Sequence, residues 1–300
     1  MNASVTLLEK VSSATVGIHS MVPPEHVSIA IGLGSERRGT GTLISADGLI
    51  LTVNYLLIGA QSVIVTLTSG EQLSAAVVAR DYPSGLGLLR IGGKNFPYLN
   101  PVSSQSCQLG QDVFNVASVG SEGRRADSGF ISYIGPFDAL WEFVLERCLM
   151  TTAMNLGHGG GPLCNSLGQL VGISYLPTMD IGKSILAIPA ESFIDCRDEL
   201  IRYGHRTSSP SQAWLGVLSY TIREHVVIAG LMPGGPAEKA GIKQGDVLIT
   251  VDGREINERR ALYELLRSHK PGDNVEFRVL RDNRVQSVRI ASTRPEDYYA

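Results

Sequence analysis

Residues 155–163 read NLGHGGGPL, and they lie within the stretch 151–175, TTAMNLGHGGGPLCNSLGQLVGISY. The glycines at positions 157 and 159–161 predict a tight turn, because glycine adopts backbone conformations that other residues avoid. Residues 170–176 after it form a short apolar run, and the residues from Asn165 to Gln169 predict a second turn before that run. This stretch therefore predicts short β-strands joined by glycine-rich turns.

The same pattern of short apolar runs, separated by Gly, Asp, Ser or Pro, extends from about residue 14 to residue 190. One of its turns, Asp47-Gly48, is a hairpin signal. Short strands at regular spacing favour closed antiparallel barrels or a sandwich over a parallel sheet with crossover helices. The spacing of apolar residues then becomes helical, and residues 190–204 predict a helix that is capped by Gly204.

A second, smaller unit follows the polar stretch HRTSSPSQ, which predicts a linker at residues 205–212. Charged residues are denser beyond this stretch, and such a shift in composition is typical of a domain boundary. The second unit mixes strands with an amphipathic helix at residues 257–269 and a final hairpin that turns at Asp282-Asn283. We therefore predict a first domain at residues 1–204, a second domain at residues 213–292 and a tail at residues 293–300.

The composition of the chain argues against several classes of function. Hydrophobic residues make up 43% of the chain and charged residues 18%, as in globular proteins, and the net charge of −3 leaves no basic footprint for nucleic acid. No apolar run reaches the roughly 20 residues of a membrane-spanning helix, and residues 1–18 lack the pattern of a signal peptide. We therefore expect no membrane segment and, for the chain as written, a cytoplasmic location, or another compartment if a leader was removed.

The four cysteines show no CxxC spacing, so we predict buried thiols, with a disulfide left open, and neither a metal site nor a cofactor. They are Cys107, Cys148, Cys164 and Cys196.

Several stretches, in the same order along the chain, resemble the HtrA family, which joins a trypsin-like protease domain to a PDZ domain. The first, RGTGTLISADGLILTVNYLLIGA at residues 38–60, is similar to the family segment that carries the catalytic histidine. ARDYPSGLGLLRI at residues 79–91 is similar to the segment of the catalytic aspartate, and residues 151–175 resemble the loop of the catalytic serine. The resemblance covers residues 5 to 292. It implies a mostly β fold, with a trypsin-like double antiparallel β-barrel followed by a small α+β PDZ domain.

The same resemblance places Tyr55, Gly85 and Gly159 at the histidine, aspartate and serine positions of the family's triad. Serine hydrolysis needs a hydroxyl nucleophile, an imidazole to take its proton and a carboxylate to orient that imidazole. Gly159 carries no nucleophile, and a tyrosine with its usual pKa of about 10 is a poor base at neutral pH. We therefore predict that the chain is not an enzyme but a pseudoprotease. The backbone of Gly157 and Gly159 corresponds to the family's oxyanion hole, and we expect this glycine-rich loop to be more mobile than the family norm.

The second unit resembles a PDZ domain most closely at residues 232–256, MPGGPAEKAGIKQGDVLITVDGREI. The sequence WLGV, Trp214 to Val217, resembles the loop that binds a C-terminal carboxylate in PDZ domains. A glycine there exposes successive backbone N–H groups, and the bound peptide adds as an extra strand. The resemblance thus implies that Trp214, Leu215, Gly216 and Val217 bind peptide, with residues around Leu262 to Leu266 forming the opposite wall.

The resulting hypothesis is a non-catalytic HtrA-like protein that binds polypeptide segments or protein C-termini through its PDZ domain. It would act in protein quality control as an adaptor, a chaperone-like binder or a regulator of active HtrA relatives. Two alternatives stay open: a serine-type endopeptidase-like hydrolase with a rearranged centre that uses His158, and a metal-binding scaffold in the vacated cleft. Family members commonly form trimers through N-terminal aromatic residues. No Phe, Trp or Tyr precedes Tyr55, so the oligomeric state stays open.

Overall fold

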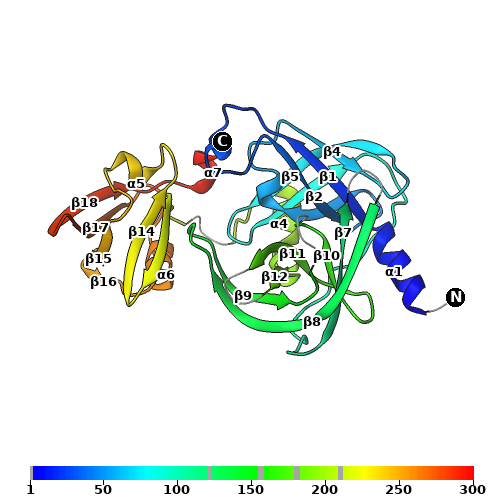
Figure 1. Cartoon of the computed structure of the whole chain (residues 1–300). Helices are drawn as coiled ribbons and strands as arrows, with labels where there is room; N and C mark the ends of the chain where they lie inside the picture. The colour runs from blue at the N-terminus through cyan, green and yellow to red at the C-terminus, as the bar shows by residue number, and fades with distance from the viewer. Residues whose placement is uncertain (1–2, 120–122, 155–158, 179–182, 209–211) are drawn as a thin grey trace. The chain divides into compact units, whose positions relative to one another are not determined.

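The computed structural model describes residues 3–119, 123–154, 159–178, 183–208 and 212–300. The chain forms two compact units (Figure 1). The first comprises residues 1–29, 33–136 and 146–208, and the second comprises residues 30–32, 137–145 and 209–300. The domain limits that we predicted from composition stay predictions. The segment Phe137–Leu145, which lies within the predicted first domain, groups with the second unit.

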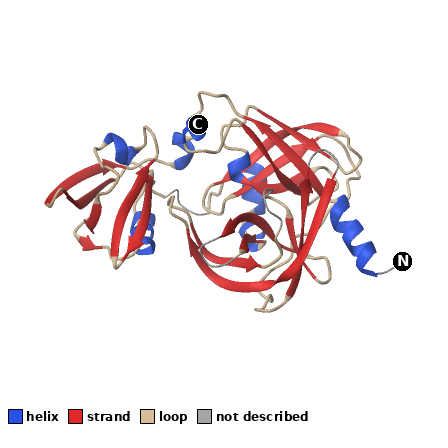
Figure 2. Cartoon of the chain, in the orientation of Figure 1, coloured by secondary structure: helices blue, strands red, loops and turns tan. Residues whose placement is uncertain are grey.

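Two closed antiparallel barrels of six strands each make up the first unit (Figures 1 and 2). In the first barrel the strands follow the order β1-β2-β3-β6-β5-β4. The apolar run LILTV of β3 is buried along its whole length, which explains why it contains almost no polar residue. The strands of this barrel are β1 (Thr15–Met21), β2 (Glu36–Leu43), β3 (Leu49–Val53), β4 (Ser62–Thr66), β5 (Gln72–Asp81) and β6 (Leu86–Ile91).

The predicted hairpin turn at Asp47-Gly48 is confirmed. Gly48 has φ +85°, a left-handed conformation that favours glycine, and a Cβ there would lie 2.5 Å from the carbonyl oxygen of Ile91. The helices and the 3₁₀ turn that flank the first barrel are α1 (Ala3–Ser13), α2 (Val27–Ala30) and η1 (Asn54–Leu56).

The second barrel has the strand order β10-β11-β12-β9-β8-β7. Its strands are β7 (Asp112–Val119), β8 (Gly123–Asp138), β9 (Val144–Thr151), β10 (Pro162–Asn165), β11 (Leu170–Thr178) and β12 (Ser184–Pro189). The helix predicted at residues 190–204 is two helices, α3 (Glu191–Ile194) and α4 (Arg197–Tyr203). The chain leaves helical geometry at Cys196, with φ −130° and ψ 16°, so the two helices do not join. Gly204 caps α4 in the left-handed conformation, as predicted.

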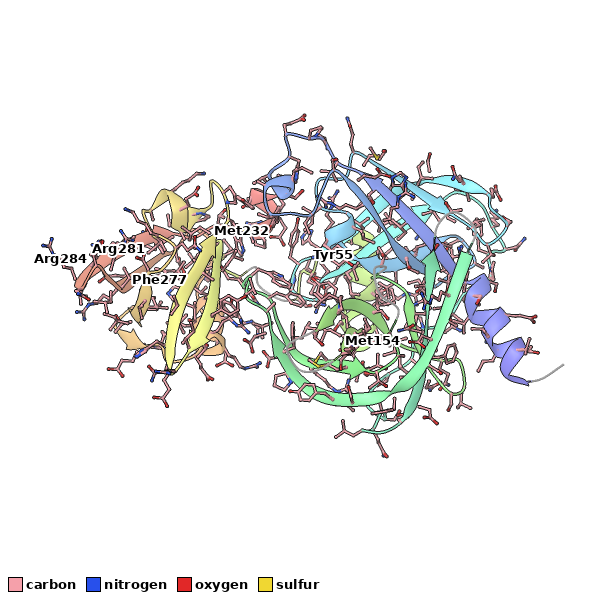
Figure 3. All side chains as sticks on the ribbon, in the orientation of Figure 1. Tyr55, Met154, Met232, Phe277, Arg281 and Arg284 are labelled. Carbon is pink, nitrogen blue, oxygen red and sulfur yellow. The ribbon has the colours of Figure 1, made fainter. Side chains whose placement is uncertain are left out.

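The second unit is a sheet in the order β13-β14-β15-β17-β18, with β16 paired to β15. Its elements are β13 (Val217–Ile222), β14 (His225–Leu231), α5 (Pro236–Lys239), β15 (Val247–Val251), β16 (Arg254–Glu255), α6 (Arg259–Arg267), β17 (Asn274–Arg281), β18 (Arg284–Ala291) and α7 (Pro295–Tyr298). Phe277 of β17 (Figure 3) is fully buried in the core of this unit. Leu215 and Leu262 of α6 belong to the same core. The predicted turn at Asp282-Asn283 is confirmed, since both residues have positive φ.

The predicted architecture is confirmed: the chain is mostly β, with a pair of six-stranded antiparallel barrels followed by a small α+β unit. None of the helices in the described ranges is long and apolar enough to cross a membrane. All four cysteines are buried and unpaired, and burial raises the pKa of Cys148 and Cys164 to about 12.

Candidate functional site

Tyr55 lies in η1, directly after the buried strand β3 (Figure 3). Its ring meets the ring of Tyr175 edge to face, with the centroids 5.6 Å apart, and its hydroxyl donates to the Tyr175 carbonyl oxygen at 3.3 Å. Burial raises the pKa of Tyr55 to about 12, and the backbone of Gly159 beside the phenol oxygen acts in the opposite direction. The phenol is therefore protonated at neutral pH and acts as a hydrogen-bond donor.

Gly159 faces this phenol across the site. A Cβ built on Gly159 would lie 2.2 Å from the Tyr55 hydroxyl oxygen and 2.4 Å from the Tyr175 carbonyl oxygen. Both distances are below any normal contact, so no side chain fits at position 159 unless its neighbours move. The structure thus brings Tyr55 and Gly159, two of the three predicted triad positions, together. It leaves no space for a nucleophilic side chain at Gly159.

Gly85, the third predicted triad position, lies in the turn between β5 and β6 with φ +79°. Its carbonyl oxygen accepts a hydrogen bond from the backbone N–H of Asn54, the residue before Tyr55, at 2.8 Å. The turn of Gly85 therefore lies against η1, the element that carries Tyr55. Gly157 and His158 lie outside the described residues.

The glycines at 159–161 are held in place by backbone hydrogen bonds to both barrels. Thr40 N–H of β2 donates to Gly159 at 2.9 Å, and Gly160 N–H donates to Ser174 of β11 at 2.7 Å. A Cβ on Gly161 would lie 2.3 Å from the carbonyl oxygen of Val116 in β7. We expected glycine to loosen this loop, but in its described part glycine is required because neighbouring backbone lies too close for any side chain.

The predicted carboxylate-binding loop of the second unit surrounds a carboxylate from its own chain. The backbone N–H groups of Leu215 and Val217 donate to the two carboxylate oxygens of Glu142, at 3.0 and 2.7 Å. Gly216 between them has φ +77°, and this left-handed conformation lets both N–H groups converge on one anion. That Leu215, Gly216 and Val217 bind peptide stays a prediction at this point.

Trp214, the fourth residue of the predicted loop, has a different environment. Its ring packs against the rings of Tyr298 and Tyr299, with centroids 4.6 and 6.1 Å away. Its backbone also pairs with Thr293 in both directions. Trp214 therefore anchors residues 293–300, which we predicted as a tail and which contain α7.

Glu142 is the residue that sequence reasoning missed. It has φ +54°, which is uncommon for a residue with a side chain. Burial raises the pKa of Glu142 to about 7, although the N–H groups of Val217, Leu215 and Gly216 favour the charged form. Nothing in its local sequence marks this role, because its partners lie 73 and 75 residues further along the chain.

Metal ligation finds no support in the part of the chain that the structure describes, since no group of three or more His, Cys, Asp or Glu side chains there could hold an ion. The predicted metal alternative rested on His158, which lies outside those residues.

Comparison with known families matches residues 39–173 to a trypsin-like peptidase domain and residues 213–291 to a PDZ domain. A DegP-like protein of Halomonas elongata, named a probable periplasmic serine endoprotease, is 33% identical over 281 residues, covering 87% of this chain and 58% of that protein. The chain thus spans less than two thirds of the length of this relative. The serine endoprotease DegS of Haemophilus influenzae is 29% identical, covering 84% of this chain and 76% of that protein.

Solved structures agree on the fold. The HtrA-type protease AlgW with a decapeptide superposes with a TM-score of 0.59 at 23% identity, covering 97% of this chain and 98% of that one. A serine endoprotease from Yersinia pestis gives 0.59 at 24% identity, covering 98% of both chains. This chain belongs to the HtrA family.

Membership of the HtrA family corrects one prediction. We expected that the chain is not an enzyme, and that expectation is contradicted, because its HtrA relatives are named serine endoproteases and the similar solved structures are named proteases. The correspondence of Tyr55, Gly85 and Gly159 to the HtrA triad stays a prediction, as does the cytoplasmic location, since several relatives are named periplasmic.

Proposed function

We propose that this HtrA-type chain recognises polypeptides by their C-termini, through the groove between β13 and α6 of its PDZ unit. The observation that carries the proposal is the pair of backbone N–H groups, on Leu215 and Val217, that converge on a single carboxylate. A C-terminal carboxylate presents the same two oxygens. In this role the chain would act as an adaptor, a chaperone-like binder or a regulator of HtrA relatives.

The position of β13 in the sheet supports the same proposal. It is the first strand in the order β13-β14-β15-β17-β18, so its outer side borders no other strand of that sheet and offers a place for an added strand. An extended peptide that adds to such an edge gains main-chain hydrogen bonds, and pockets for alternate side chains supply specificity. The apolar wall opposite β13 comes from α6, where Leu262, Leu265 and Leu266 are buried.

We expect the chain to bind a labelled decapeptide with a free C-terminal carboxylate at least ten-fold more tightly than the same peptide as its C-terminal amide. The reason is that a hydrogen bond to a charged group contributes about 1.5–3 kcal/mol, which corresponds to roughly ten-fold or more in affinity. Fluorescence polarisation with the full chain measures both affinities. Equal binding of the acid and the amide would overturn the proposal.

A second candidate function is peptide-bond hydrolysis at a rearranged centre, and the observation that favours it is the naming of the relatives as serine endoproteases. An acyl intermediate needs a side-chain nucleophile, which a glycine at position 159 does not supply. In this candidate water therefore attacks the peptide carbonyl carbon, His158 accepts the proton of that water, and the same proton goes to the peptide nitrogen as its bond to the carbonyl carbon breaks. Casein turnover that His158→Ala abolishes would support it. Turnover that His158→Ala leaves unchanged, or its absence from the unaltered chain, would contradict it.

A further inference from the structure

A segment of the chain itself, residues 138–144, contacts both β13 and α6. It runs from the last residue of β8 to the first residue of β9. On the β13 side, Glu142 accepts from the N–H groups of Leu215 and Val217, and the carbonyl oxygen of Leu140 accepts from Ser219 N–H at 2.9 Å. The three donors are alternate residues, as in strand pairing, where every second N–H group points to the same side. The segment therefore lies along β13 in the manner of an added strand.

Two arginines of α6 form hydrogen bonds with the two ends of the same segment. Arg259 at the start of α6 donates from Nε to the carboxylate of Asp138 at 2.7 Å and from Nη2 to its carbonyl oxygen at 2.8 Å. Near the end of α6, Arg267 donates to the carbonyl oxygen of Val144 at 2.9 Å. Polar contacts from both walls thus hold the segment between Asp138 and Val144.

The segment also supplies an apolar group to the groove. Val144 is 5% exposed and belongs to the same buried cluster as Leu215 of the carboxylate-binding loop and Leu266 of α6. Glu142 and Val144 therefore provide, from two residues, the carboxylate and the aliphatic side chain that a single C-terminal residue carries together. Because Glu142 is in a left-handed conformation, the chain turns there instead of ending.

We propose that residues 138–144 are a built-in ligand of the PDZ groove, and that the partner which displaces them is a polypeptide C-terminus with an aliphatic last residue and an acidic residue four positions before it. This inference rests on the proposed function. The spacing follows from the segment itself: Glu142 takes the place of the terminal carboxylate, and Asp138, four residues earlier, is paired with Arg259. An external peptide of this composition would satisfy the same donors.

The test compares Glu142→Ala with the unaltered full chain, using labelled decapeptides that end in valine and carry glutamate or glutamine four positions before it. Without the Glu142 carboxylate the built-in ligand loses its bonds to Leu215 and Val217. We expect Glu142→Ala to bind the glutamate peptide at least ten-fold more tightly than the unaltered chain. Glu255→Ala, which removes an exposed glutamate of β16 in the same unit, is the matched control and should leave the affinity unchanged.

Two further measurements keep the result interpretable. Amide hydrogen exchange should show Leu215, Val217 and Ser219 protected in the unaltered chain and unprotected in Glu142→Ala, while β17 and β18 stay protected in both. Adding Arg259→Ala to Glu142→Ala should remove the preference for the glutamate peptide over the glutamine peptide. Equal preference with and without Arg259 would overturn the assignment of the acidic position.

The affinities distinguish an error about the built-in ligand from an error about C-terminal recognition. If Glu142→Ala and the unaltered chain bind the glutamate peptide with the same affinity, and both prefer the acid to the amide, the built-in ligand is excluded and C-terminal recognition stands. If neither chain binds the peptide, C-terminal recognition itself is excluded.

The competition should also depend on pH. Docking raises the pKa of Glu142 to about 7, so the contribution of this carboxyl to docking is fully present below its ordinary pKa and is lost as pH rises through about 7. Tyr263 of α6 faces it, and burial raises the pKa of Tyr263, which stays neutral throughout. We expect the affinity ratio between Glu142→Ala and the unaltered chain to shrink several-fold from pH 6 to pH 8. A ratio that does not change with pH would contradict this prediction.

Discussion

Gly160→Ala is expected to lower the free energy of unfolding of the first unit by about 2–6 kcal/mol. Overpacking a tight core site costs about 1–3 kcal/mol, and a strained backbone conformation adds about 1–3 kcal/mol. Both apply here, because Gly160 has φ +100° and a Cβ there would lie 2.0 Å from the carbonyl oxygen of Thr40. The Thr52 hydroxyl, 2.4 Å from the same point, closes the remaining side. Urea unfolding followed by circular dichroism measures the difference.

Gly92→Ala is the matched control for this substitution. Gly92 has no positive φ and no atom within 4 Å of the added Cβ, so we expect a change below about 0.5 kcal/mol. If the two alanine variants unfold at the same urea concentration, the prediction that the turn leaves no room for a side chain at Gly160 is wrong.

Asp81→Ala is expected to destabilise the first unit by about 3–5 kcal/mol, the usual cost of removing one partner of a buried ion pair. Asp81 is only 2% exposed, and its carboxylate accepts hydrogen bonds from Arg206 Nε at 2.9 Å and Nη2 at 2.6 Å. The Ser84 hydroxyl donates to the same carboxylate. Removing it leaves a largely buried guanidinium without its counter-ion. Thermal unfolding of the two chains measures the loss.

An exposed ion pair of the same barrel provides the control. Asp47 and Arg90 are paired at 2.5 Å, but their side chains are 62% and 36% exposed, so water screens the interaction. Asp47→Ala should therefore cost less than about 1 kcal/mol. The argument from burial fails if Asp81→Ala is no more destabilising than Asp47→Ala. Replacing Asp81 and Arg206 together by apolar residues should recover part of the loss, because no unpaired charge is then left.

These substitutions also separate the structural role of the loops from their role in a reaction. Gly160 lies next to Gly159, and Asp81 accepts the backbone N–H of Gly85, so both support the predicted triad positions without being among them. If a variant is less stable but still binds peptide, the substituted residue stabilises the barrels and has no role in peptide binding. The PDZ unit, whose core is a separate cluster around Phe277, should keep its fold in either variant.

Much of the fold is determined by features that are local in the sequence. The strands follow from short apolar runs, the turns at Asp47-Gly48 and Asp282-Asn283 from residues that tolerate positive φ, and the end of α4 from Gly204. The resemblance to HtrA proteins depends on ordered motifs of the same local kind. Such signals can be recognised without knowledge of distant contacts, because each depends only on neighbouring residues.

The tertiary structure decided which residues far apart in the chain come into contact, and local signals do not contain this information. It placed the Tyr55 hydroxyl against Gly159, so that a glycine run suggestive of mobility is instead a requirement of close packing. It also placed Glu142, an acidic residue among apolar neighbours, on the two N–H groups of the carboxylate-binding loop. Both contacts join residues that are far apart in the chain, and their energies come from burial and from hydrogen bonds that exist only once the elements have packed.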